Sequence, residues 1–69
     1  MPDNTRLTVN LNPETAAALR EIVENRNISF TEAIRRAVAI YKLIEDETAQ
    51  GHKIQINEGT KVREVVLLA

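Results

Sequence analysis

Polar and apolar residues alternate strictly near the start of the chain, where residues 6–12 read RLTVNLN. A two-residue period is typical of a half-buried β-strand, with apolar side chains on one face and polar ones on the other. The apolar face holds Leu7, Val9 and Leu11, and the polar face holds Arg6, Thr8 and Asn10. A single strand is not stable alone. In so short a chain, we expect the strand to pair with the same strand of a second copy.

A first helix is predicted from about residue 13 to about residue 25. Asn12 is a strong N-cap residue, Pro13 suits the first helical position, and Glu14 suits the positive end of the helix. Apolar residues then recur at helical spacing, at Ala16, Leu19, Ile22 and Val23. Asn27 can adopt the left-handed conformation that ends helices.

A second, longer helix is predicted from about residue 30 to about residue 49. Ser29 and Glu32 have the spacing of a capping box, and Gly51 is positioned to cap the other end. Between them, apolar residues recur in steps of three and four: Phe30, Ala33, Ile34, Ala37, Val38, Tyr41 and Ile44. Ile40 and Leu43 widen this face beyond what one neighbouring helix needs, which again indicates a partner chain.

The remaining residues predict a C-terminal β-hairpin. Residues 53–57 alternate, Glu58 and Gly59 are a turn signal, and residues 60–68 are rich in β-branched side chains. The fold class is therefore α+β and mainly helical, in the order strand, helix, helix, hairpin.

The size of the chain favours a dimer. A chain of 69 residues buries little apolar surface, and small domains usually gain stability from disulfides, a metal or a second subunit. There is no cysteine and His52 is the only histidine, so disulfides and the common zinc sites are excluded. We therefore expect an obligate dimer in which Leu7, Val9, Leu11, Leu19, Ile22, Ile34, Val38 and Tyr41 are core or interface positions.

Composition and charge narrow the function. No apolar run approaches a membrane span and no signal peptide is visible, so we expect a cytoplasmic protein with no membrane role. No glycine-rich phosphate loop, nucleophile–histidine pair or carboxylate cluster is present, so we expect no enzyme, no metal and no cofactor. The net charge is −1, but residues 1–42 hold six basic and five acidic side chains, against three basic and five acidic in residues 43–69. Any DNA-binding surface must be a local face of the first part.

The ordered combination of these elements resembles the ribbon-helix-helix DNA-binding proteins of the Arc/MetJ/CopG type. The residues that carry the resemblance are the alternating strand 6–11 with the Asn-Pro-Glu cap 12–14, and the capped helix start SFTEAIRRA at 29–37. The match covers roughly residues 5–48. The chain has Asn27 where such proteins often carry glycine, and asparagine tolerates the same backbone conformation.

The resemblance implies a binding mode. Two strands would pair antiparallel across a two-fold axis, and this ribbon would enter the major groove of double-stranded DNA. Arg6, Thr8 and Asn10 would then contact the bases. The free amides at the start of the second helix, at Ser29, Phe30 and Thr31, would contact a phosphate.

Three functions remain open. The first is a transcriptional repressor, with residues 1–51 as the DNA-binding and dimerisation domain and residues 52–69 as a hairpin that extends the dimer or recruits further dimers. The second is an antitoxin whose C-terminal segment binds a toxin partner while the N-terminal part binds DNA. A toxin-binding tail is typically polar and disordered until bound, whereas residues 60–68 are hydrophobic. The third is a dimerisation module with no DNA role.

Overall fold

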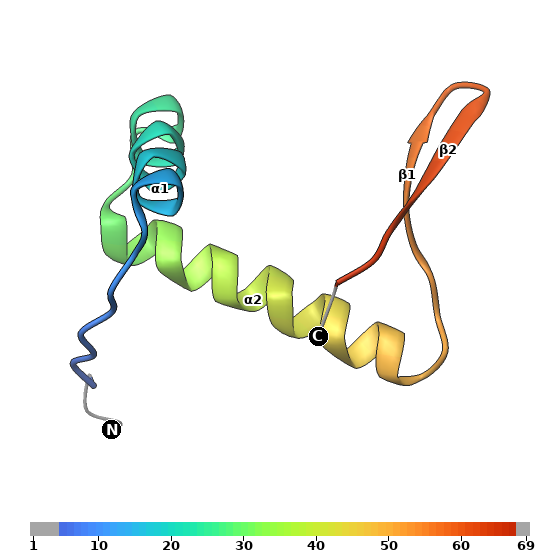
Figure 1. The fold of residues 1–69 in the computed structure, drawn as a ribbon, viewed down its shortest axis with the longest axis horizontal. Coiled ribbons are helices and arrows are strands. Elements are labelled where there is room, and N and C mark those ends of the chain that lie inside the picture. Colours follow the sequence, from blue (N-terminus) through green and yellow to red (C-terminus); the bar gives the residue numbers. More distant parts are fainter. Residues whose placement is uncertain (1–4, 68–69) are drawn as a thin grey trace. The chain divides into compact units, whose positions relative to one another are not determined.

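The computed structural model describes residues 5–67, with two helices followed by a two-stranded antiparallel sheet (Figure 1). The elements are α1 (Pro13–Arg26), α2 (Phe30–Ala49), β1 (Ile54–Glu58) and β2 (Lys61–Val65). The α+β, mainly helical class and the order of these elements are as predicted. The chain divides into two units, one up to Ala33 and one from Ile34 onward, and each is described by itself.

Both ends of α1 are held by the residues that the sequence singled out. The Asn12 side chain accepts a hydrogen bond from the backbone N–H of Thr15 at 2.8 Å, and Pro13 begins the helix. At the other end, Asn27 is left-handed, with φ 53° and ψ 48°. The N–H of the next residue, Ile28, donates to the Val23 carbonyl at 3.2 Å, which is the long bond of a Schellman motif.

The α2 helix is bounded in the same way. The Ser29 hydroxyl accepts from the backbone N–H of Glu32 at 3.0 Å. Gly51 has φ 84°, and its N–H donates to the Thr48 carbonyl at 3.0 Å, while the N–H of His52 donates to the Glu47 carbonyl at 3.0 Å. These two bonds complete a second Schellman motif, so the predicted glycine cap is confirmed.

The C-terminal hairpin is present, with a turn shifted from the prediction. Five residue pairs, from Ile54↔Val65 to Glu58↔Lys61, leave Gly59 and Thr60 as the loop. Gly59 has φ 59°, a conformation that side chains disfavour and two-residue hairpin loops require at this position. Thr60 therefore belongs to the turn, and β2 ends at Val65 rather than near Leu68, which lies outside the described residues.

Residues 5–12 form neither helix nor strand in the single chain. A strand exists only beside a neighbour to which its backbone is bonded. The neighbour that the sequence predicts is the same segment of a second chain, so the intermolecular ribbon remains a prediction.

The described part of the chain has almost no core of its own. Ala33, with 4% of its surface exposed, is the only buried residue in residues 5–67. Of the predicted core set, Leu19 is half-buried and the others are exposed, up to 81% for Leu7. The apolar faces that the sequence predicts are therefore exposed in the single chain.

Candidate nucleic-acid interface

The first candidate surface is the segment before α1. Arg6, Thr8 and Asn10 are all exposed, and each is separated from the next by an exposed apolar residue. The segment joins α1 at Asn12, whose backbone is extended with φ −69° and ψ 164°. The hydrogen bond of the Asn12 side chain to Thr15 fixes the direction in which the chain enters the helix.

The second candidate surface is the first turn of α2. The Ser29 carbonyl accepts the first bond of the helix, from the N–H of Ala33 at 3.0 Å, and the Ser29 hydroxyl accepts the N–H of Glu32, which otherwise has no partner within the helix. The N–H groups of Phe30 and Thr31 have no hydrogen-bond partner among the described residues. Two neighbouring backbone donors at the positive end of a 20-residue helix suit an anion such as a phosphate.

These two groups of residues belong to the same unit but occur on different stretches of chain. Arg6, Thr8 and Asn10 follow one another before α1, whereas Ser29, Phe30 and Thr31 are consecutive after it. No hydrogen bond or ion pair between the two groups occurs in the described range.

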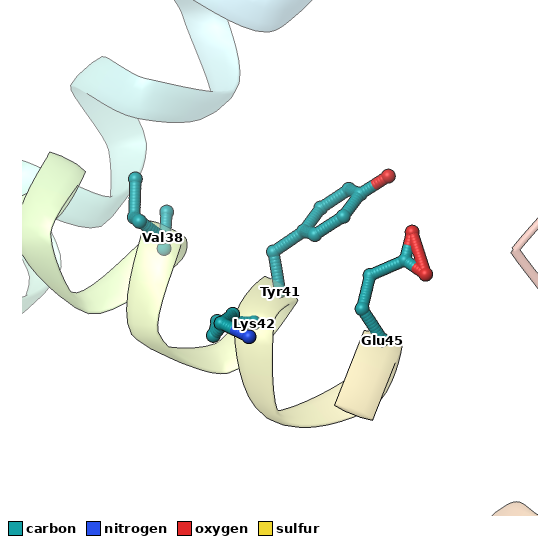
Figure 2. A pocket seen from close by; sticks show the side chains of 5 residues that line it. Val38, Tyr41, Lys42 and Glu45 are labelled. Carbon is teal, nitrogen blue, oxygen red and sulfur yellow. The ribbon is translucent and has the colours of Figure 1, made fainter. Parts of the chain in front are cut away.

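An apolar groove of about 450 Å³ lies on α2, lined by Ala37, Val38, Tyr41, Lys42 and Glu45. Figure 2 shows the side chains of Val38, Tyr41 and Glu45 projecting from the same side of the helix. Val38 and Tyr41 remain 61% and 56% exposed. The sequence predicted these two residues as interface positions. It gave Lys42 and Glu45 no part in that surface, although both lie four residues after them.

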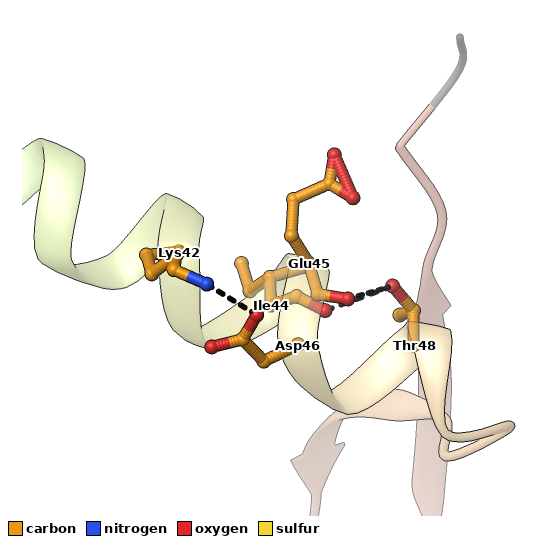
Figure 3. A network of polar contacts seen from close by, with 5 residues as sticks. All are labelled: Lys42, Ile44, Glu45, Asp46 and Thr48. Carbon is orange, nitrogen blue, oxygen red and sulfur yellow. Dashed lines mark hydrogen bonds and ion pairs between the residues drawn. The ribbon is translucent and has the colours of Figure 1, made fainter.

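Side chains in the second half of α2 make polar contacts with residues close to them in sequence. Lys42 pairs with Asp46 at 2.6 Å, and the Thr48 hydroxyl donates to the carbonyls of Ile44 and Glu45 (Figure 3). The ring of His52 lies 2.9 Å from a Glu47 carboxylate oxygen. With Glu45, Asp46 and Glu47 in succession, this end of α2 is acidic and does not suit phosphate.

Two further classes of site are absent from the described residues. Neither helix has the length and apolarity that a membrane span requires. No group of three or more His, Cys, Asp or Glu side chains in this range could hold a metal ion.

Comparison with protein families identifies the class. The model of the ribbon-helix-helix proteins of the CopG family matches residues 5–45, which include the N-terminal segment, α1 and most of α2. The chain belongs to this family. Comparisons with curated proteins and with solved structures gave no match.

Membership assigns a general activity. Proteins of this family are DNA-binding transcription regulators rather than enzymes, and they typically dimerise. The hairpin of β1 and β2 lies outside the matched residues. The family match therefore assigns no role to this hairpin.

Proposed function

We propose that the protein is a transcriptional repressor that binds operator DNA as a homodimer, through a β-ribbon formed by the N-terminal segments of two copies. The observation that carries the proposal is the uncovered apolar surface of a chain that belongs to a DNA-binding family. Leu7 and Val9 are 81% and 64% exposed, and the large apolar side chains of α2 are also exposed at Phe30, Ile34, Val38 and Tyr41. Full burial of one such side chain stabilises a fold by about 1.5–3 kcal/mol.

In this proposal the two faces of the ribbon contact different partners. The apolar face covers the helices of the dimer, and the opposite face enters the major groove. There Arg6 would bond to guanine in a bidentate manner, Asn10 to adenine, and Thr8 would offer its hydroxyl and methyl groups. The alternation of residues 6–11 supports this division because a strand cannot bury both sets.

The phosphate contact is proposed at Ser29, Phe30 and Thr31. Its support is the pair of N–H groups at Phe30 and Thr31 that the described residues leave without a partner. A contact of this kind fixes the position of the dimer on the duplex and carries no sequence information.

The antitoxin alternative rests on a C-terminal segment that becomes ordered only with a toxin. The hairpin has continuous pairing over five residue pairs within the chain itself, which gives that alternative no support. We therefore take residues 1–51 as the DNA-binding and dimerisation domain and residues 52–69 as an extension with a separate role.

The test is a binding titration of the full chain with DNA from upstream of its own gene and with random DNA of equal length. Binding that is at least about tenfold tighter to the upstream DNA, by a dimer, supports the proposal. Equal and weak binding to both DNAs would overturn the proposal. A dimerisation module with no DNA role would then be favoured.

A further inference from the structure

The hairpin has features that the DNA-binding proposal does not use. Within the described residues, β1 and β2 form a sheet of two strands, so each strand has one edge without a neighbour there. A two-stranded hairpin is at best marginally stable in water, and a third strand or a packed surface is needed for stability. Pairing of one edge with a further strand would therefore stabilise the hairpin. The two edges differ in charge.

The edge of β1 is uncharged over most of its length. Residues 54–57 read IQIN, with neither a charge nor a proline, and Glu58 follows next to the turn. In β2, by contrast, Lys61, Arg63 and Glu64 are charged. Charged side chains on an edge strand oppose pairing with another chain, so β2 is blocked and β1 is open.

The register decides which backbone groups point outward. A two-residue loop makes Glu58 and Lys61 the first hydrogen-bonded pair, and bonded pairs then recur at every second residue. The N–H groups of Gln55 and Asn57 consequently point away from the hairpin on the β1 side. Those of Val62 and Glu64 point away on the β2 side.

We propose that β1 pairs antiparallel with β1 of a second copy, about a two-fold axis at Gln55, to form a four-stranded sheet in the order β2–β1–β1–β2. In this register, Ile54 of each copy lies opposite Ile56 of the other. The register with the axis at Ile56 places Ile54 opposite Glu58, which loses the match of apolar side chains. The axis at Gln55 is therefore favoured.

The pairing extends one apolar face of the hairpin. Ile54 and Ile56 share a face with Val65, the cross-strand partner of Ile54. Ile54 and Val65 are half-buried in the single chain, while Ile56 is exposed. Two copies place six such side chains on one face of the new sheet. Arg63, the cross-strand partner of Ile56, lies on this face in each outer strand, where it pairs with Glu58 at 2.7 Å.

Pairing through β2 instead is opposed by charge in the symmetric registers centred on Val62, Arg63 and Glu64. An axis at Arg63 places two arginines opposite each other, and an axis at Glu64 places two glutamates opposite each other. An axis at Val62 places Lys61 opposite Arg63. Like charges directly opposite are destabilising. Because β2 forms both outer edges of the four-stranded sheet, association stops at two hairpins.

Amide hydrogen exchange of the full chain tests this inference directly. The outward amides of Gln55 and Asn57 should exchange at least about tenfold more slowly than those of Val62 and Glu64. In a sample mixed from two isotope-labelled preparations, Ile54 of one copy should contact Ile56 of another. Equally fast exchange at all four amides, or protection only at Val62 and Glu64, overturns the proposal.

A matched pair of variants separates the two edges. Gln55→Pro and Glu64→Pro alter cross-strand partners, and each removes an N–H that the hairpin itself does not use. Gln55→Pro should abolish the contact between copies, while Glu64→Pro should retain it. Loss in both variants or in neither contradicts the assignment of the β1 edge. Should Gln55→Pro unfold the hairpin, the exchange pattern of the unaltered chain still decides.

The hairpin pairing does not depend on the proposed DNA-binding ribbon. Slow exchange at Gln55 and Asn57 in a chain that binds no specific DNA would leave this inference standing and remove the proposed function. Specific DNA binding with fast exchange at both residues would do the reverse.

Discussion

The hydroxyl of Ser29 accepts the backbone N–H of Glu32 at 3.0 Å, and this bond caps α2 while it leaves the N–H groups of Phe30 and Thr31 without a partner in the described chain. One residue thus stabilises the helix and prepares an anion site beside it. The two roles can be separated because aspartate is as good an N-cap as serine but repels a phosphate.

Ser29→Asp should therefore keep the stability of the fold and weaken DNA binding. We expect the thermal midpoint to be unchanged or raised, because the cap is retained at the positive end of α2. Affinity should fall by a similar factor for operator and random DNA, since the contact is to the backbone. Titrations with both DNAs and a thermal scan make the measurement. Ser29→Ala, which loses the cap at a cost of about 1 kcal/mol without adding charge, is the control. Unchanged affinity in Ser29→Asp would show that no phosphate lies at this turn.

Burial of the α2 face in a dimer can be read from a single substitution. Val38 is 61% exposed in the single chain, where replacement by alanine should be neutral or slightly stabilising because alanine favours helix. In the proposed dimer, Val38→Ala removes buried methyl groups and should cost on the order of 1–3 kcal/mol. Urea unfolding of the two proteins decides between these values.

The control for Val38→Ala is Asp46→Ala. Asp46 does not itself line the groove, and the change breaks only its exposed ion pair with Lys42, worth about 0–1 kcal/mol. The unfolding midpoint should also rise with protein concentration, as dimer dissociation requires. A midpoint that is independent of concentration, together with a monomeric mass, contradicts the proposed dimer.

The sequence predicts features that depend on residues nearby in the chain, and it cannot show features that depend on a second chain. Asn12, Ser29 and Gly51 were assigned as caps because a cap depends on residues three or four positions away, and all three are confirmed. The strand of residues 6–12 depends on a second chain. Its alternation fixes which side chains share a face but cannot supply the neighbour, so the ribbon and its DNA contacts remain proposals.

The sequence placed the hairpin turn one residue too early. The sequence indicated a turn at Glu58 and Gly59, but the loop is Gly59 and Thr60. Threonine is β-branched and favours strands, so pattern alone placed Thr60 in the strand. The pairing of Glu58 with Lys61 overrides that preference, because the left-handed Gly59 closes a two-residue loop there.

Gly59→Ala should destabilise the hairpin through its backbone. A methyl group at this position would meet nothing within 4 Å, so any effect comes from φ 59°, which alanine disfavours by about 1 kcal/mol. Amide shifts of residues 54–65 should lose dispersion in Gly59→Ala and retain it in Gly59→Asn, since asparagine tolerates positive φ better. Equal dispersion in both variants would mean that the turn does not control the hairpin. Random-coil shifts in the unaltered chain would instead favour the antitoxin alternative.

The polar face of the N-terminal segment should determine which DNA sequence is bound. Arg6→Ala and Asn10→Ala should each lose about 1–3 kcal/mol of binding free energy on the operator and far less on random DNA. Fold stability should hardly change, because both side chains are exposed and lie on the polar face of the segment. Arg20→Ala removes the same charge from an exposed position of α1 and is the matched control for Arg6→Ala.

Salt dependence provides the second arm of that experiment. The chain carries a net charge of −1, so a steep fall of affinity with salt must come from local phosphate contacts, at about 0.9 logarithmic units per contact. Asn10→Ala should keep this slope and lose discrimination, because it removes a base contact alone. If Arg6→Ala, Thr8→Ala and Asn10→Ala combined leave operator affinity intact in a folded protein, the bases are read by another surface. The proposed repressor mechanism would then fail at its central step.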